Sequence, residues 1–284
     1  MTHPAAADGQ LEQLAERAVG GDRDALEQLC RQLQHPVYRL ALRMTGHPDD
    51  AADAAQEAMI RIVTHLAQYQ GRSAFMTWAY AVTARQLLTT RKRAAEASVR
   101  GPAAFAAFLD RHRDDGAPSP ASSAEYAQLC ADVRYSCTYG MLLCLTRPLR
   151  LAYLLGDLMG MTDVDGAAIC DTTPAAFRQR LARARATMRT IIADRCGLVR
   201  AANPCRCTKL VAASVDNGLL DPHAPRFARH PGATGEVALD TITQAADQLD
   251  LAVALAEVYR TDPDWLAPAQ VWAGLQRACP DLLR

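Results

Sequence analysis

Apolar residues recur at intervals of three and four along most of the chain, and stretches that alternate apolar and polar residues are almost absent. An interval of three to four residues is the period of a helix that buries one face. Capping and breaking residues divide the first block, residues 11–93, into predicted helices over 11–19, 23–34, 37–44, 49–66 and 74–93. Asp22 is the expected cap of the second helix, and His35-Pro36 is the expected break after it. The pattern predicts an all-α protein.

A stretch rich in helix breakers separates the first block from a second one. Residues 94–123 hold Gly-Pro and Asp-Gly-Ala-Pro sequences, which predict a linker with one short helix around Phe105. The second block is 124–199, and it is followed by a cysteine-containing segment, 200–213, and by an extension, 214–284. We therefore predict two helical domains joined by a linker, plus a small helical C-terminal extension.

The charge balance is even for the whole chain but uneven along it. The 284 residues include 31 basic and 31 acidic side chains. Residues 177–200 hold seven arginines and one acid, whereas 214–284 hold ten acids and five arginines. No apolar run approaches the roughly 20 residues of a membrane helix, and the N-terminus lacks the basic and apolar parts of a secretory signal. We expect a cytoplasmic protein that does not enter a membrane.

The second block ends in a helix over 163–170, a short turn and a longer helix over 175–194, an arrangement typical of DNA-binding helix-turn-helix units. Thr173 and Pro174 suit the start of the second helix as cap and first helical residue. Its apolar stripe consists of Phe177, Leu181, Ala184 and Met188. Its arginines lie on the other faces: Arg178, Arg180, Arg183, Arg185 and Arg189. Guanidinium groups suit phosphates, although a solvated basic helix without a ligand is the alternative.

Two stretches resemble the bacterial RNA polymerase sigma factors of the extracytoplasmic-function (ECF) type. DDAADAAQEAMIRI (49–62) with YQGRSAFMTWAYAVTA (69–84) is similar to region two of that family. DLMGMTDVDGAAICDTTPAAFRQRLARAR (157–185) is similar to region four, and the two occur in the order of the family. The resemblance implies a region-two domain over 11–93 and a region-four domain over 124–199.

The resemblance also implies roles for the matched residues. Those that would bind core RNA polymerase are Asp53, Gln56 and Glu57. Those that would meet the −10 promoter element are Phe75, Trp78, Tyr80 and Arg85. Those that would meet the −35 element are Thr173, Ala176, Arg178, Gln179, Arg180 and Arg183. For the polymerase set the alternative is a solvated helix face, and for Phe75 and Trp78 it is the hydrophobic core.

The chain departs from the family pattern at several positions. Met76, Ala81 and Ala84 stand where region two usually has basic side chains, which weakens or changes the expected −10 contact. Gly166 replaces an aliphatic residue, at a cost of up to about 1 kcal/mol in helix propensity. Asp171 replaces the glycine of the turn, and we expect it to adopt the left-handed conformation that aspartate tolerates.

Three of the nine cysteines, Cys196, Cys205 and Cys207, fall within twelve residues. Three thiols can hold zinc if a fourth ligand joins them, and the candidates are Cys137, Cys144 and His223. The usual paired C-x-x-C spacing is absent. The alternative is that these thiols only pack.

No enzymatic motif stands out in the sequence. The main hypothesis is a sigma factor that binds core RNA polymerase and promoter DNA, with an anti-sigma factor as a further candidate partner. The alternatives are a plain helix-turn-helix regulator and a sigma-fold interaction module without DNA contacts. The extension, with helices expected near 235–259 and 268–277, either stabilises the fold or covers the arginine face or the polymerase surface.

Overall fold

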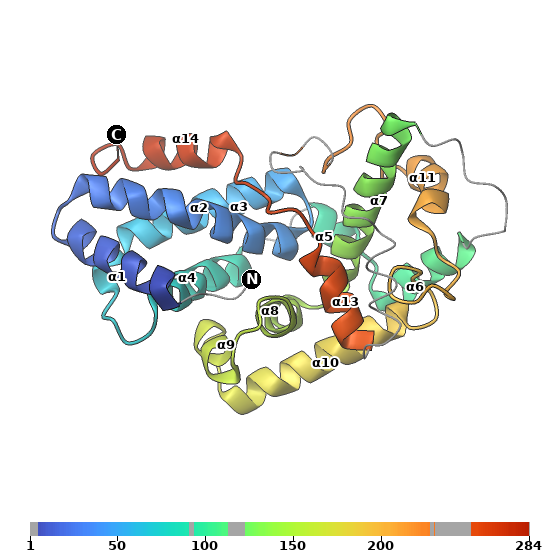
Figure 1. Cartoon of the computed structure of the whole chain (residues 1–284), viewed down its shortest axis with the longest axis horizontal. Coiled ribbons are helices and arrows are strands. Elements are labelled where there is room, and N and C mark those ends of the chain that lie inside the picture. The colour runs from blue at the N-terminus through green and yellow to red at the C-terminus, as the bar shows by residue number, and fades with distance from the viewer. Residues whose placement is uncertain (1–4, 91–93, 113–122, 228–229, 231–250, 284) are drawn as a thin grey trace.

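The computed structural model describes residues 5–90, 94–112, 123–227, 230 and 251–283. These residues form helices that share one hydrophobic core (Figure 1). Within them, β structure is limited to an isolated parallel bridge between Cys196 and Cys205. The all-α prediction is confirmed. None of the helices in these ranges combines the length and the apolar character needed to cross a membrane.

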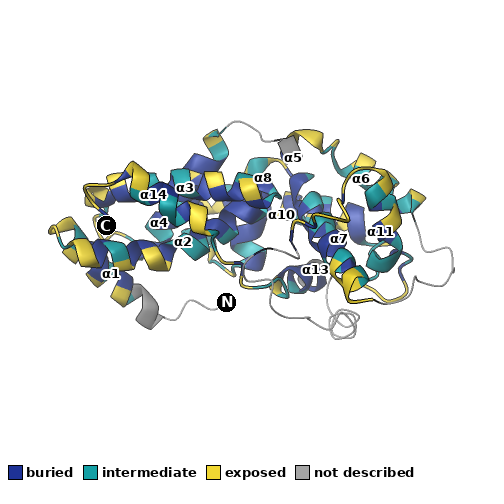
Figure 2. Cartoon of the chain, turned by 90° about the horizontal axis from the view of Figure 1, so that it is seen from above, coloured by how far each residue is buried: buried dark blue, intermediate teal, exposed yellow. Residues whose placement is uncertain are grey.

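The first block folds into helices that match most of the predicted ones. They are α1 (Ala5–Val19), α2 (Arg23–Thr45), α3 (Pro48–Thr64), a 3-10 turn (Leu66–Gln68) and α4 (Phe75–Thr89). Asp22 caps α2 as expected, because its carboxylate accepts a hydrogen bond of 3.0 Å from the backbone N–H of Ala25. Gly46 ends α2 in the left-handed conformation, with φ of 71°. The buried faces of α2 and α3 pack against each other (Figure 2).

The predicted break at His35-Pro36 is wrong, because α2 continues through Pro36. A proline inside a helix costs about 3 kcal/mol. Leu33, Val37 and Tyr38 are fully buried on either side of it. Full burial of one large apolar side chain contributes about 1.5–3 kcal/mol. Burial of the apolar face therefore outweighs the local preference.

The linker and the second block are also helical. Their elements are α5 (Ala94–Ser98), α6 (Pro102–Arg111), α7 (Ala124–Leu143), α8 (Arg147–Tyr153), a π-helical turn (Leu154–Leu158), α9 (Asp163–Ile169), α10 (Pro174–Ile192) and α11 (Cys207–Asp216). The short helix expected around Phe105 is α6, whose Leu109 is buried and which packs on α10. Helix α11 runs across the expected boundary between 213 and 214.

A buried ion cluster ties the linker to both blocks. Arg150 of α8 is 1% exposed and donates hydrogen bonds to the carbonyl oxygens of Met44 at the end of α2 and of Leu142 at the end of α7. It also contacts the carboxylate of Glu96 at 3.2 Å, and Arg147 contacts the same carboxylate at 2.7 Å. Burial alone would raise the pKa of Glu96, but the hydrogen bonds and charges of the two arginines hold it below its ordinary value.

The extension returns from the second block to the first. Helix α13 (Leu251–Arg260) packs against the π-helical turn and α10, and α14 (Ala269–Ala278) packs against α3 (Figure 1). We call residues 261–268, which join these helices, the strap. Of the two helices expected in the extension, the second corresponds to α14. Most of the first, 235–259, lies outside the described residues, and α13 is its described part.

The two blocks also touch directly. Helix α4 of the first block packs on α9 of the second, and α2 packs on α7. Arg85 of α4 lies 3.9 Å from the carboxylate of Asp171, in the turn between α9 and α10. The surfaces expected to bind DNA are therefore neighbours in this structure.

Candidate functional site

Helices α9 and α10 form the predicted helix-turn-helix. Asp171, in the turn, has φ of 48°, so the expected left-handed conformation is confirmed. Thr173 caps α10 by accepting a hydrogen bond of 3.2 Å from the backbone N–H of Ala176, and Pro174 is the first helical residue. The predicted buried stripe is also confirmed, with Phe177 fully buried.

Gly166 lets the two helices of this unit approach each other. A Cβ atom at this position would overlap the ring carbons of Phe177. The lost helix propensity, up to about 1 kcal/mol, is offset by burial of the whole phenylalanine ring, which contributes about 1.5–3 kcal/mol. The departure from the family pattern is thus explained by packing.

The arginines of α10 differ in their surroundings. Arg178 and Arg183 are exposed, as are Thr173 and Gln179, whereas Ala176 and Arg180 are half-buried. Arg178 forms an ion pair of 3.1 Å with Asp163 of α9. Arg185 instead binds the largely buried carboxylate of Asp157 through two nitrogens, at 2.5 and 3.0 Å, which fixes α10 to the π-helical turn. The N-terminal half of α10 is the part whose polar side chains face outward.

Helix α3 carries the three residues expected to dock on polymerase. Asp53 is exposed, and Gln56 and Glu57 are half-buried. The carboxylate of Glu57 accepts a hydrogen bond of 2.5 Å from the Nε2 of Gln86 on α4. The amide of Gln56 lies against Gly274 of α14.

The aromatic residues at the start of α4 form a cluster. Phe75 is fully buried, and its ring centroid lies 5.5 Å from that of Trp78 and 5.0 Å from that of Tyr69. Tyr80 is also buried, whereas Trp78 is half-buried and Arg85 is exposed. In this structure Phe75 and Tyr80 therefore belong to the core, as the alternative interpretation of Phe75 stated, and Trp78 and Arg85 are accessible.

Comparisons with known proteins include a family match over the α3–α4 part of this site. The Sigma-70 region 2 family matches residues 29–96, which include α3 and α4. The RNA polymerase sigma-H factor of Pseudomonas aeruginosa is 31% identical over 180 residues, which cover 62% of this chain and 90% of that protein. The chain belongs to the ECF RNA polymerase sigma factors. The ECF RNA polymerase sigma-E factor of Escherichia coli is likewise 31% identical over 177 residues, or 61% of this sigma factor and 88% of that protein.

A solved structure described as CnrH in complex with the cytosolic domain of CnrY is also similar. It has a TM-score of 0.46 and 18% identity to this sigma factor, and the match covers 65% of this chain and 97% of that chain. The matches to the two relatives leave more than a third of this sigma factor outside them. This sigma factor therefore has many residues outside the part that it shares with these relatives.

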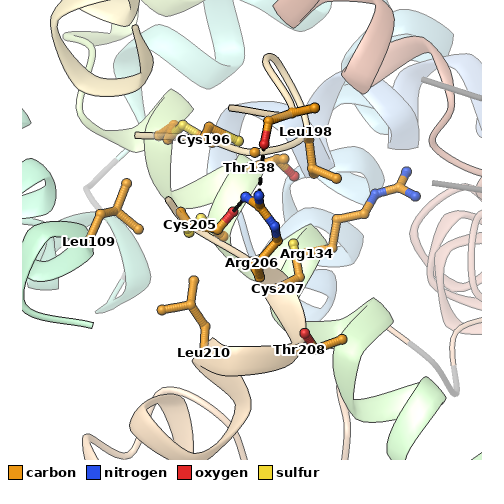
Figure 3. Close-up of a pocket in the computed structure, with 14 residues that line it drawn as sticks. Leu109, Arg134, Thr138, Cys196, Leu198, Cys205, Arg206, Cys207, Thr208 and Leu210 are labelled. Carbon is orange, nitrogen blue, oxygen red and sulfur yellow. Dashed lines mark hydrogen bonds between the residues drawn. The ribbon is translucent and has the colours of Figure 1, made fainter. Parts of the chain in front are cut away.

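Four thiols of this sigma factor line one cavity of about 510 Å³ (Figure 3). Cys196 and Cys205 face each other in the isolated β-bridge, Cys207 begins α11, and Cys137 comes from α7. Burial raises the pKa of all four, that of Cys205 to about 12. The backbone N–H groups of Leu198 and Val199 act in the opposite direction on Cys196. Thiols with such raised pKa values react slowly at neutral pH.

The candidate fourth ligands for zinc lie in different surroundings. Of the three candidate fourth ligands, Cys137 lines the cavity, His223 is exposed, and the Cys144 thiol donates to the carbonyl oxygen of Gly140. Across the described ranges, no group of three or more histidine, cysteine, aspartate or glutamate side chains is arranged to hold a metal ion. Zinc binding by Cys196, Cys205 and Cys207 therefore stays a prediction.

Elemental analysis of the purified protein tests that prediction. Bound zinc should amount to about one equivalent per chain, and a chelator should loosen residues 190–210, because structural metal binding is coupled to folding. Cys137→Ser should lower the zinc content, and Cys30→Ser on α2 is the matched control. Metal-free protein with unchanged melting would show that the thiols only pack.

The contact between α14 and α3 could not be located from the sequence, which left open what the extension covers. Its signal is Gly274, a glycine inside a predicted amphipathic helix, since such a glycine often marks a close helix contact. The partner helix could not be read from that signal, because the two helices are more than 200 residues apart.

Proposed function

We propose that this sigma factor binds core RNA polymerase and directs it to promoters, without catalysing a reaction of its own. The observation that carries the proposal is the similarity to sigma factors over 88–90% of their length. Core polymerase would meet the α3 face with Asp53, Gln56 and Glu57. The proposed place of action is the cytoplasm, and an anti-sigma partner stays a prediction.

The N-terminal half of α10 is the proposed reader of the −35 element. Thr173, Arg178, Gln179 and Arg183 are exposed there, with Ala176 and Arg180 half-buried beside them. The N-terminal residues of a recognition helix are those that reach base edges in the major groove. The ion pair between Arg178 and Asp163 is solvent-exposed, and exposed pairs are worth only about 0–1 kcal/mol. Phosphate or base contacts can therefore replace it.

The start of α4 is the proposed −10 surface. Trp78 is the accessible aromatic residue on which an unstacked base can lie, since aromatic rings stack on any base. Phe75 supports its ring from within, and Tyr80 holds α4 in the core. Arg85 adds the exposed positive charge at this helix.

Run-off transcription with purified core polymerase tests the proposed function. A promoter template should yield a transcript of defined length only when both core polymerase and this protein are present. Core polymerase alone and the protein alone are the controls. Polymerase that neither binds this protein nor starts at a promoter would contradict the proposal.

The DNA-contact assignment predicts a measurable loss for two single variants. Arg178→Ala and Arg180→Ala should each weaken binding to a −35 duplex by about 1–3 kcal/mol if the side chain pairs with a base. A lost phosphate contact would instead reduce the salt slope by about one. Arg23→Ala, at the exposed start of α2, is the control. Fluorescence anisotropy at several salt concentrations measures both effects, and unchanged binding in the double variant would overturn the assignment.

A further inference from the structure

The C-terminal helix of this chain lies on the helix that carries the proposed polymerase-binding residues. Helix α14 runs along α3, and it buries Val271, Gly274 and Leu275 in the contact with the first block (Figure 1). At the closest approach, a Cβ atom on Gly274 would overlap the Oε1 and Cδ atoms of Gln56. Gln56 is one of the three residues expected to meet polymerase. The contact therefore covers part of the expected docking face.

Two further contacts fix α14 on the first block. The guanidinium of Arg31 on α2 lies 4.4 Å from the ring centroid of Trp272, at a distance typical of a cation–π interaction. Cys279, directly after α14, is buried near Cys30 of α2: burial raises the pKa of the Cys30 thiol, and the nearby Cys279 thiol adds to the rise. The helix is thus also held on α2, by residues before and after Gly274 in the sequence.

The strap anchors the approach to α14 through buried groups. Trp265 is fully buried, and its indole N–H donates a hydrogen bond of 2.9 Å to the hydroxyl of Tyr139 on α7. The backbone N–H of Ala267 donates to the Nδ1 of His35 on α2, also at 2.9 Å. The strap is therefore held by both blocks.

The acids of the strap bind arginines outside α10. Asp262 is buried between Arg43 of α2 and Arg134 of α7, at 3.6 and 3.8 Å. Asp264 contacts Arg39 of α2 at 3.1 Å. These ion pairs direct the extension to α2 and α7. The structure thus places α14 on α3, the helix with the residues expected to bind polymerase.

We propose that α14 is an intramolecular competitor of core RNA polymerase for the face of α3 around Gln56. This inference rests on the proposed function, because it takes that face to be the docking surface. Since α14 belongs to the same chain, its local concentration is high, and even a weak contact is well populated. Polymerase then binds only the fraction of molecules in which α14 has left α3, so its apparent affinity falls by that fraction.

A single substitution in the full chain should separate α14 from α3. Gly274→Glu places a side chain where the amide of Gln56 now lies and adds a negative charge next to the acidic face with Asp53 and Glu57. Gly274→Ala is a milder variant, because the flexible end of Gln56 can move away from one methyl group. Ala278→Glu is the matched control, since Ala278 is exposed on the same helix.

Two measurements on the parent and these variants test the proposal. Hydrogen exchange of residues 269–278 should be faster in Gly274→Glu than in the parent, and the affinity for core polymerase should rise. If α14 covers α3 in about 90% of the parent molecules, its release should raise the affinity for core polymerase about tenfold. Ala278→Glu should match the parent in both measurements.

The outcomes separate this inference from the proposed function. If α14 is released but polymerase affinity stays at the parental value, α14 does not compete and the inference is overturned, while the proposed function stands. If neither parent nor variant binds polymerase, the proposed function fails and the inference fails with it. If Gly274→Glu does not fold, Trp272→Ala, which removes the contact with Arg31, takes its place, and the same two results decide.

Discussion

Arg150→Met should lower the free energy of unfolding by about 3–5 kcal/mol, which is the range for breaking a buried ion pair. Methionine keeps most of the volume but donates no hydrogen bonds. The carbonyl oxygens of Met44 and Leu142 then lose a donor in the interior, and each unsatisfied buried group costs about 1–3 kcal/mol. Urea unfolding followed by circular dichroism measures the loss.

The pH dependence of this loss follows from Glu96. Its pKa is lowered in the folded protein by Arg147 and Arg150, although burial acts in the opposite direction. The stability from the cluster is therefore present at neutral pH and disappears as the pH falls through the lowered pKa of Glu96. The difference between parent and Arg150→Met should shrink in acid. Arg17→Met, which breaks a largely exposed pair with Asp22, should cost at most about 1 kcal/mol, and an equal cost for both variants would contradict the assignment.

Trp265→Ala should remove about 3–5 kcal/mol from the attachment of the strap, the usual cost of truncating a buried tryptophan to alanine. The indole is fully buried, donates to Tyr139, and lies edge-on to the rings of Tyr135 and His230 at 5.1 Å from each. We expect the loss of stability to be confined to the strap and α14, because the strap is not part of the helices that form the two blocks. Hydrogen exchange should show faster opening over 262–283 than over α2.

Leu266→Ala is the neighbouring control for this prediction. Leu266 is 42% exposed, so its truncation should change stability by no more than about 0.5 kcal/mol. A global loss of stability in Trp265→Ala, with equal acceleration of exchange in α2 and in the strap, would show that Trp265 supports the whole core.

Local signals predicted most of the helices and the whole helix-turn-helix. Asp22, Thr173 and Pro174 act at helix ends within a few residues of themselves, so their effects can be read from the sequence. The expectation at Pro36 was wrong because the burial of Leu33 and Val37 depends on how α2 packs against other helices.

The candidate site divides in the same way. The outward-facing arginines of α10 follow from helix periodicity. The ion pair of Arg185 with Asp157 depends instead on the π-helical turn, which the apolar periodicity of the sequence did not predict. The contact of α14 with Gln56 depends on how the extension packs back on the first block. The uneven charge distribution pointed to the arginines of α10, but the described acids of the strap meet Arg39, Arg43 and Arg134, which are spread over α2 and α7.

The strap has a consequence for how two ligands communicate. Both blocks hold it, and they also touch through α4 and α9. A ligand that separates α4 from α9 must supply the free energy of this opening. A second ligand then binds a chain that is already open. Polymerase and promoter DNA should therefore bind with positive cooperativity, each raising the affinity for the other by the same factor, as thermodynamic linkage requires. The extension would thereby favour the ternary complex over either binary one.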